Sequence, residues 1–347
     1  MSVINLLKPL LAIKSPTYLE KECIDFCQEW ILKNTSLKTR RIGDNLIAEC
    51  NQNGKKPHLS FVGHLDVVPE HFEPIKKNNK IYGAGASDMK GGVAAFLWFI
   101  HQYELELCKQ YHISIILYAR EEGTAIKENG LYEIIQQETK FLKSIDLAII
   151  AEPTNNTIQL GCVGSIHATL TVQGKASHSA RPWDGDNALY KALPVIQYFA
   201  DQVPVVHQVS GVTFSDVISI TESQSQPGRT TIPGEWTANI NFRYAPVHED
   251  AESILIQHCK RAGLKKESIA IKDHAPAGSV IDTVFFNQII RQLDQPIEAK
   301  QAWTDVAQLT EIGIAAFNFG PGLTAQAHLP NEYIEVKMIN DYIIFLT

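Results

Sequence analysis

The stretch SFVGHLDVVP, residues 60–69, ends an apolar run with His64 and Asp66 separated by a single residue. Side chains on an extended segment repeat with period two, so these two point to the same side. A metal-binding histidine needs its second ring nitrogen held in place, and a nearby carboxylate commonly does this. The stretch therefore predicts a buried strand that ends at a metal ligand, His64, with Asp66 as its orienting group.

Further carboxylates and one more histidine occur in segments that mostly follow predicted strands. The segments are AGASDMKGGVAAF with Asp88, YAREEGTA with Glu121 and Glu122, IIAEPT with Glu152, and GLTAQAHLPNE with His328. Glu121 and Glu122 come just after the apolar run 113–119, where neighbouring side chains diverge. One of the pair can therefore bind a metal while the other acts as a general base toward a water molecule.

The charge of this set favours two metal ions over one. Two Zn²⁺ bring four positive charges, of which Asp88, Glu122 and Glu152 neutralise three and a hydroxide the fourth. One zinc with three carboxylates would leave surplus negative charge in a partly buried site, which is costly. We therefore expect a two-metal site bridged by Asp88, with the metals about 3.5–4 Å apart.

Each segment also has an ordinary structural explanation. Single H-x-D patterns often occur by accident, and the pair Glu121-Glu122 is typical of a solvated surface. Asp88 suits the N-cap of the helix that begins in GGVAAF. Glu152 before Pro153 suits the end of a strand, and His328 suits an ordinary loop. The occurrence of all five segments in this order is what predicts a metal centre.

The pattern of apolar residues predicts an α/β fold with two domains. Apolar strands near residues 59–62, 113–119 and 147–151 alternate with helices such as 92–110, which indicates a largely parallel sheet with its site at the carboxyl ends of the strands. The segment TYLE, Thr17 to Glu20, resembles a capping box that opens the first helix.

From about residue 164 the pattern changes to strict alternation of apolar and polar residues, typical of half-buried strands. Two alternating strands cover 166–172 and 236–244. Helices are expected at 187–202 and 250–262, and further strands at 212–220 and 268–272. The order β-α-β-β-α-β predicts a ferredoxin-like insertion. We expect a catalytic domain formed by 1–163 and 274–347, and an inserted lid and dimerisation domain at 164–273.

The series GHLDVVP, YGAGASDMKGG, EEG, AEPT and GPG-x5-H resembles the co-catalytic zinc aminoacylase and carboxypeptidase superfamily. Within it, four stretches are most similar to the succinyl-diaminopimelate desuccinylases, especially their actinobacterial form. These stretches are AEPTNNTIQLGCVGS, GKASHSARPWDGDNAL, ANINFRYAP and AWTDVAQLTEIGIAAFNFGPG. The resemblance covers nearly the whole chain.

The resemblance implies five ligands for two zinc ions per subunit, with Co²⁺ as a substitute metal. They are His64 and Glu152 for one ion, Glu122 and His328 for the other, and Asp88 as the bridge. Asp66 would support His64, and Glu121 would activate the attacking water. His178, in KASHSARP, matches a histidine that reaches across a homodimer to polarise the scissile carbonyl.

The reaction implied is hydrolysis of N-succinyl-LL-2,6-diaminopimelate to succinate and LL-2,6-diaminopimelate, a step in lysine and cell-wall precursor synthesis. The residues expected to bind this substrate are Ser165, Thr230, Arg243 and Thr304. Arg243 alternates onto the polar face of its strand and suits a substrate carboxylate by bidentate geometry, although a solvated edge residue would have the same pattern. An exposed strand edge in the insertion suits antiparallel pairing between subunits.

Departures from the family pattern keep other functions open. Thr230-Thr231 stands where the family usually has Asn-Val, and Cys162 stands where other desuccinylases have an arginine. Ala302-Trp303-Thr304-Asp305 replaces a Gly-Gly-Thr-Ser-Asp run. The alternatives are an N-acetyl amino-acid deacetylase of the acetylornithine type, a dipeptidase of the same superfamily, and a non-catalytic metal-binding relative.

Composition bounds the remaining classes. The 347 residues exceed a usual single core, and 45% hydrophobic with 20% charged residues is ordinary globular material. A net charge of −7 argues against nucleic acid as a partner.

The first residues are a poor signal peptide because Lys8, Pro9 and Lys14 interrupt them. No apolar run approaches the ~18 residues that a membrane span needs. The six cysteines do not suggest a disulfide framework, and Cys23 and Cys27 fall on one helical face. We expect a cytoplasmic enzyme with a small-molecule N-acyl amino-acid substrate and no membrane partner.

Overall fold

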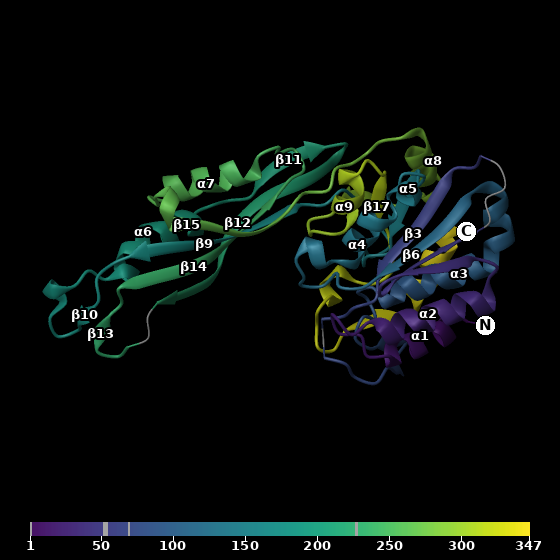
Figure 1. The fold of residues 1–347 in the computed structure, drawn as a ribbon, viewed down its shortest axis with the longest axis horizontal. Helices are drawn as coiled ribbons and strands as arrows, with labels where there is room; N and C mark the ends of the chain where they lie inside the picture. Colours follow the sequence, from purple (N-terminus) through teal and green to yellow (C-terminus); the bar gives the residue numbers. More distant parts are fainter. Residues whose placement is uncertain (1, 51–54, 69, 226–227) are drawn as a thin grey trace. The chain divides into compact units, whose positions relative to one another are not determined.

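The computed structural model describes residues 2–50, 55–68, 70–225 and 228–347. The chain divides into two compact units. The first unit comprises Met1–Gly161, Ser279–Glu298 and Gln308–Thr347, and the second unit comprises Cys162–Gly278 and Ala299–Ala307. Both combine helices and sheets (Figure 1), and the predicted α/β class with two domains is confirmed.

The first unit is built on an eight-stranded sheet with the order β1-β2-β6-β3-β7-β17-β8-β16. Its strands are β1 (Lys38–Ile42), β2 (Asn45–Glu49), β3 (His58–His64), β6 (His112–Tyr118), β7 (Leu147–Ile150), β8 (Ile158–Leu160), β16 (Ile297–Ala299) and β17 (Ala316–Asn318). The central strands β6, β3, β7 and β17 are parallel. Strands β3, β6 and β7 are buried along their whole length, which explains why each is a continuous apolar run in the sequence.

Helices cover both faces of this sheet (Figure 1). Neighbouring side chains of a strand point to opposite faces. On β3, Phe61 contacts Phe96 and Phe99 of α3 (Lys90–Gln110), whereas His58 contacts Phe141 of α5 (Thr139–Leu142). Helices α1 (Val3–Ala12) and α10 (Val336–Leu346) pack on α3. The other helices with residues in this unit are α2 (Lys21–Asn34), α4 (Gly130–Gln137), α8 (Val284–Leu293) and α9 (Val306–Glu311).

The expected capping box at Thr17 and Glu20 is wrong. The first helix is α1, and α2 begins at Lys21 without a side-chain cap from Glu20. Instead, Glu20 Oε1 accepts hydrogen bonds from the backbone N–H groups of Tyr18 and Arg120. The Thr17 hydroxyl lies 3.2 Å from Asp66 Oδ2. This segment therefore holds the loops that follow β3 and β6, a tertiary role that local sequence does not reveal.

A three-stranded sheet fixes the loop that precedes α3. It has the order β18-β5-β4, with β4 (Ile75–Lys77), β5 (Lys80–Tyr82) and β18 (Tyr333–Glu335). Tyr333 pairs with Tyr82, and the N–H of Gly83 donates to the carbonyl of Glu332. Residues near the carboxyl end of the chain therefore lie beside the loop of residues 83–88.

The second unit contains the predicted β-α-β-β-α-β order. Its elements are β9 (Gly164–Gln173), α6 (Ala188–Ala200), β12 (Val212–Ser225), β14 (Glu235–Tyr244), α7 (Ala251–Arg261) and β15 (Ile269–Ala275). The apolar face of β9 and β14 packs against α6 and α7 in one hydrophobic core. The ferredoxin-like prediction is therefore confirmed, and it follows from the alternation along β9 and β14.

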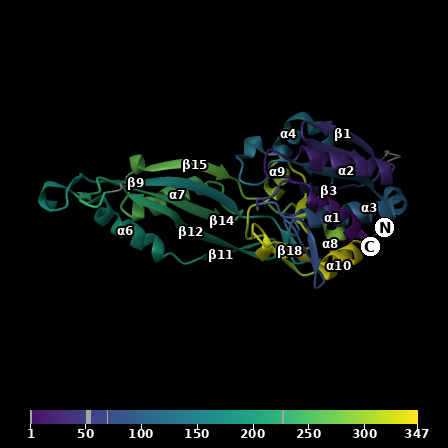
Figure 2. The same ribbon diagram turned by 90° about the horizontal axis from the view of Figure 1, so that it is seen from below.

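One edge strand of this unit was not predicted. β11 (Val205–Val209) pairs with β12 and extends the sheet to the order β11-β12-β14-β9-β15, so that β11 and β15 form its two edges (Figure 2). A two-residue turn, Ser210-Gly211, joins β11 to β12 with positive φ at both residues. Such a turn fits the twist of a hairpin, so the Ser-Gly dipeptide was the available signal. Two short strands, β10 (Ser177–His178) and β13 (Thr231–Ile232), pair separately.

All six cysteines are free, and Cys23 and Cys27 lie on the buried face of α2 as predicted. In the part of the chain that the structure describes, no helix is long and apolar enough to span a membrane.

The burial of His58, the first residue of β3, should make the stability of the fold depend on pH. Its Nδ1 lies 3.0 Å from Ser144 Oγ and its Nε2 2.8 Å from Ser114 Oγ. Burial, together with the neighbouring imidazole of His112, lowers its pKa to about 3. Below about pH 6.5 the His58 side chain binds a proton in the unfolded chain but stays neutral in the folded chain. The free energy of unfolding therefore falls as the pH drops below about 6.5.

Between pH 7 and pH 5, metal-free wild type should therefore lose about 2 kcal/mol more free energy of unfolding than His58→Gln. Urea denaturation at both pH values measures this. His101→Gln is the control, because it removes another histidine of the first unit and leaves His58 in place. Equal pH dependence in wild type and His58→Gln would contradict the assignment.

Candidate metal centre

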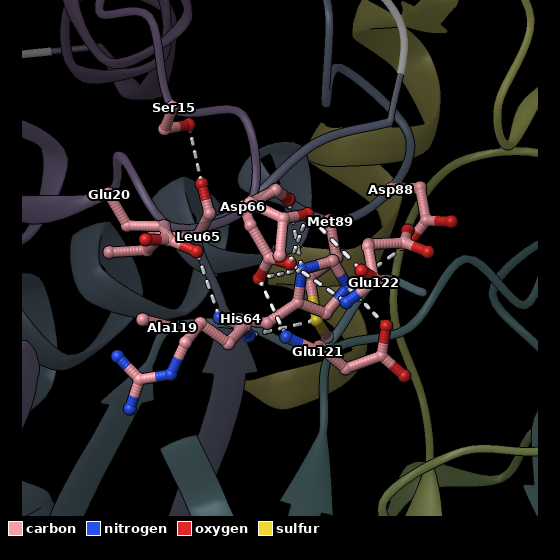
Figure 3. A network of polar contacts seen from close by, with 12 residues as sticks. Ser15, Glu20, His64, Leu65, Asp66, Asp88, Met89, Ala119, Glu121 and Glu122 are labelled. Carbon is pink, nitrogen blue, oxygen red and sulfur yellow. Dashed lines mark hydrogen bonds and ion pairs between the residues drawn. The ribbon is translucent and has the colours of Figure 1, made fainter. Parts of the chain in front are cut away.

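The predicted ligands of the first unit come together at the carboxyl ends of its parallel strands. His64 ends β3, Glu121 and Glu122 follow β6, and Glu152 follows β7. The loop before α3 adds Asp88, and the loop before β18 adds His328. Figure 3 shows His64 at the centre of this network, with Asp66, Asp88, Glu121 and Glu122 around it.

One group of three residues surrounds His64 Nε2. Asp88 Oδ1 lies 3.3 Å from it and Glu152 Oε1 3.9 Å. His64 is 1% exposed, Asp88 8% and Glu152 7%. The three ligand atoms lie close enough together to hold one ion.

A second group lies around His328 Nε2. Glu122 Oε1 is 3.0 Å from it, and Asp88 Oδ2 is 3.5 Å from it. Asp88 thus faces one group with Oδ1 and the other with Oδ2. A carboxylate with one oxygen directed at each of two ion positions has the arrangement of a bridging ligand.

The donor set fits divalent metal ions. Asp88 Oδ1 is buried and accepts no hydrogen bond within the described residues, although buried polar atoms are normally satisfied. Asp88 is also not the helix cap that its sequence position allows, because the N-cap of α3 is Met89. Imidazole nitrogens and carboxylate oxygens that converge on a common point are the ligands of zinc-type sites.

The protonation behaviour of the cluster agrees with this fit. Burial opposes a charge on His64, yet Asp88, Glu121 and Asp66 raise its pKa well above the usual range. Hydrogen bonds to Asp88 and Glu122 raise the pKa of His328 to about 10. Burial raises the pKa of Glu122. Without metal, protons therefore balance the carboxylates, and a bound cation would take over that role and release protons.

Asp66 acts on the centre in more than one way. Its backbone carbonyl lies 3.1 Å from His64 Nδ1, while its carboxylate lies 3.6 Å from the same nitrogen. The carboxylate accepts the backbone N–H groups of Glu121 at 3.1 Å and Glu122 at 2.8 Å. Fully buried Asp66 therefore fixes both the imidazole and the backbone that carries the two glutamates.

The sequence interpretation missed Glu332. This fully buried carboxylate accepts the backbone N–H groups of Gly85 at 2.8 Å, Ser87 at 2.7 Å and Asp88 at 2.8 Å. Burial raises its pKa to about 7, while the three N–H groups favour the ionised form. The available signal was the Asn-Glu dipeptide that follows His328 in HLPNEY, in the same quoted segment as a predicted ligand.

The other predicted site residues belong to the second unit, and their contacts there are with residues of that unit. They are Ser165, His178, Thr230, Arg243 and Thr304. Exposed His178 lies in β10, where Ala180 N–H donates to its Nδ1 at 3.1 Å. This bond places the proton of a neutral ring on Nε2. Thr230 lies next to β13, and its carbonyl accepts the N–H of Ser179 at 2.8 Å.

Arg243 is part of a polar chain on the sheet of the second unit. Its Nε donates to Asn241 Oδ1 at 3.0 Å, and Asn241 Nδ2 donates to Ser165 Oγ at 3.1 Å. No carboxylate of the described residues pairs with this guanidinium, and burial lowers its pKa. Thr304 is buried, and its hydroxyl has no hydrogen-bond partner within the part of the chain that the structure describes.

A pocket of 410 Å³ opens beside the metal cluster within the first unit. Its lining residues include His328, His71 and Phe72. It offers space next to the ligand His328.

The first unit has a mixed sheet whose central strands are parallel, with paired groups of metal ligands at the ends of those strands, and the second unit is ferredoxin-like. Together these features define the class of two-domain metal-dependent hydrolases. The family described as Peptidase family M20/M25/M40 matches residues 60–347, and the chain belongs to this family. The protein is thus an enzyme, a metal-dependent hydrolase that acts on amide bonds.

The whole chain is similar to a curated relative. The succinyl-diaminopimelate desuccinylase of Corynebacterium glutamicum is 30% identical over 97% of this chain and 93% of its own length. This similarity confirms the recognition of desuccinylases made from the sequence motifs.

Two solved structures share the fold. A tripeptidase from Staphylococcus aureus aligns with a TM-score of 0.80 at 16% identity, covering 99% of this chain and 95% of its own. A dinuclear metal-binding M20 peptidase from Bacillus subtilis aligns with a TM-score of 0.72 at 14% identity, with the same coverage of both chains.

The contacts of Glu332 predict that it positions Asp88. Glu332→Gln replaces one acceptor oxygen by a donor and should weaken zinc binding about 10- to 100-fold, as loss of supporting groups around metal ligands usually does. Competition with a chromophoric chelator measures the affinity. Glu335→Gln is the matched control, since partly exposed Glu335 pairs with Lys80 and not with the Asp88 loop. Unchanged affinity in Glu332→Gln would contradict this role.

Proposed function

We propose that the protein hydrolyses N-succinyl-LL-2,6-diaminopimelate to succinate and LL-2,6-diaminopimelate, with two zinc ions per subunit. The observation that carries the proposal is the pair of ligand groups sharing Asp88, in a chain similar over nearly its whole length to a desuccinylase. The name of the Bacillus subtilis structure, a dinuclear metal-binding peptidase, supports two ions.

His64 and Glu152 would hold one zinc, Glu122 and His328 the other, and Asp88 both. Bound zinc polarises a carbonyl and lowers the pKa of water, so that a nucleophile forms near neutral pH. Cobalt prefers similar nitrogen and oxygen ligands and is proposed to substitute. The matched charge of three carboxylates and one hydroxide with two divalent cations supports two ions rather than one.

Glu121 is the proposed general base. Its backbone is fixed by Asp66, and its Oε2 lies 4.0 Å from His64 Nε2, at the edge of the ligand cluster. Its carboxylate takes one proton from the attacking water as the new C–O bond forms at the succinyl amide carbonyl. The same carboxyl group then gives that proton to the leaving amine nitrogen as the C–N bond breaks. One residue thus serves both proton transfers.

His178 is the proposed donor to the oxyanion. Ala180 N–H holds Nδ1, which leaves Nε2–H as the donor. Stabilisation of the developing negative charge by such a donor commonly contributes 10²-fold or more to kcat. We propose that His178 reaches the partner subunit's centre in a homodimer, and that residues 164–273 act as lid and dimerisation domain while 1–163 and 274–347 carry the catalysis.

Arg243 is proposed to bind a substrate carboxylate. Asn241 fixes its Nε, and the rest of its partly buried guanidinium has no carboxylate partner within the described residues. A substrate carboxylate would supply the missing charge in bidentate geometry. Ser165, Thr230 and Thr304 are proposed as further polar contacts, and the partnerless Thr304 hydroxyl supports its assignment.

A second candidate function rests on Cys162. Where other desuccinylases have an arginine, this buried thiol contacts the Thr304 carbonyl at 3.4 Å. A thiol in this position offers no positive charge for a succinyl carboxylate. The observation favours a smaller acyl group, as in N-acetylornithine, or a dipeptide substrate with the same metal chemistry.

Replacing the proposed base separates catalysis from metal binding. Glu121→Gln should lower kcat about 100-fold or more, because general-base catalysis contributes that much, while two zinc ions stay bound. Steady-state kinetics and metal analysis measure both quantities. Glu73→Gln, at a glutamate whose side chain is 85% exposed, is the control. Near wild-type turnover by Glu121→Gln would refute the assignment.

Substrate choice is measured by comparing succinate release from N-succinyl-LL-diaminopimelate with acetate release from N-acetylornithine. The succinyl compound should have the higher kcat/KM, and its turnover should stop on chelation and return with zinc. Turnover of the acetyl compound alone would keep the metal mechanism and discard the succinyl substrate. Zinc binding without hydrolysis of any N-acyl amino acid would indicate a non-catalytic relative.

A further inference from the structure

A second cluster of metal-ligand side chains lies in the second unit. It consists of His207 on β11, Asp216 on β12 and His248 in the turn between β14 and α7. The three residues come from separate segments, and no short sequence motif links them. None of them has a role in the proposed hydrolysis.

Both imidazoles are directed at the same carboxylate oxygen. His207 Nε2 lies 2.9 Å from Asp216 Oδ2, and His248 Nε2 lies 2.6 Å from it. The other oxygen, Oδ1, accepts the backbone N–H of Ala245 at 2.7 Å. The carboxylate is therefore held by its backbone contact and presents Oδ2 to the two rings.

The position of each residue makes this arrangement stable. Asp216 is opposite Val205 and His207 is opposite Phe214 in the β11–β12 ladder, so the two lie diagonally on one face, within reach of each other. Asp216 is 9% exposed, whereas the His207 and His248 side chains are 22% and 17% exposed. An ion can therefore enter from the solvent at the imidazole side.

Two imidazoles and one carboxylate form a known ligand set for zinc, with the fourth position left to water. Zinc bonds of about 2.0–2.2 Å separate the ligand atoms of a tetrahedral site by roughly 3.3 Å. The three atoms already lie within 4.8 Å of one another. Small side-chain rotations that open the two short contacts would make room for the ion, which would replace the imidazole N–H donors.

We propose that His207, Asp216 and His248 bind a divalent transition-metal ion, with Zn²⁺ as the best match, in addition to the ions of the hydrolytic centre. The ion cross-links the edge strand β11, which pairs only with β12 within the described part of the sheet, to the turn that leads into α7. A ligand that binds only the folded state stabilises it by mass action, so the bound ion stabilises the edge strand of the second unit.

The test compares zinc content after equilibrium dialysis of the full chain against micromolar Zn²⁺. His248→Gln and His207→Gln should each bind one zinc ion per subunit fewer than wild type, with kcat/KM unchanged within about twofold. Added zinc should raise the thermal unfolding midpoint of the second unit in wild type but not in these variants. His258→Gln is the matched control, because this histidine of α7 contacts Tyr198 instead of the cluster.

Two outcomes would overturn the proposal. Equal zinc content in wild type and both variants would show that the three side chains are joined by hydrogen bonds alone. Loss of hydrolysis together with the zinc would place the lost ion in the hydrolytic centre. Asp216→Asn, which keeps a hydrogen-bond acceptor, provides a third variant, and circular dichroism verifies that the compared proteins are folded.

Discussion

Four carboxylates and two imidazoles meet at the ends of parallel strands in the first unit, and their mutual charge is the constraint on which the rest of the site depends. Asp88, Glu121, Glu122 and Glu152 would repel one another in a space this buried. Protonated histidines offset this charge in the metal-free chain, and cations do so in a working enzyme. The two oxygens of Asp88 face different imidazoles, so in the proposed two-ion centre this one residue would set where both cations lie.

Hydrogen bonds from neighbouring segments hold the ligand-bearing loops in place despite this repulsion. Asp66 and Glu332 do not add to the ligand set; their carboxylates accept backbone N–H groups of the residues that carry the ligands. Each carboxylate therefore fixes, through peptide N–H donors, the backbone of loops that carry the ligands. Glu332 reaches its partners because β18 pairs with β5, so a small three-stranded sheet fixes the position of Asp88. Ligand position thus depends on strand pairing between segments about 250 residues apart.

The sequence was sufficient wherever a local pattern carries the information. Buried strands are visible as apolar runs, β9 and β14 as alternation, and the ligands as polar residues at strand ends. Prediction from the sequence failed where a contact joins distant segments. Thr17 and Glu20 match a capping box locally, yet tertiary partners occupy both side chains. Glu332 and the His207, Asp216 and His248 cluster have no periodicity, because only the folded chain brings their partners together. β11 has the sequence VVHQV and is mostly exposed, and because its valines do not alternate with polar residues, no alternating pattern indicated it.

Under the proposed function, the choice between acyl substrates would depend on charged side chains rather than on the metal centre. N-succinyl-diaminopimelate carries three carboxylates, whereas N-acetylornithine carries one, so Arg243 alone can satisfy the second compound but not the first. Cys162 contributes no charge, and its burial against Thr304 closes that position. A site for the succinyl compound must therefore draw on other cations of the second unit. Arg181 is 66% exposed and its N–H donates to the carbonyl of His178, and Arg229 directly precedes Thr230. Both arginines adjoin proposed substrate residues, so under the proposed function they would offer the succinyl carboxylate a positive charge that Cys162 does not provide.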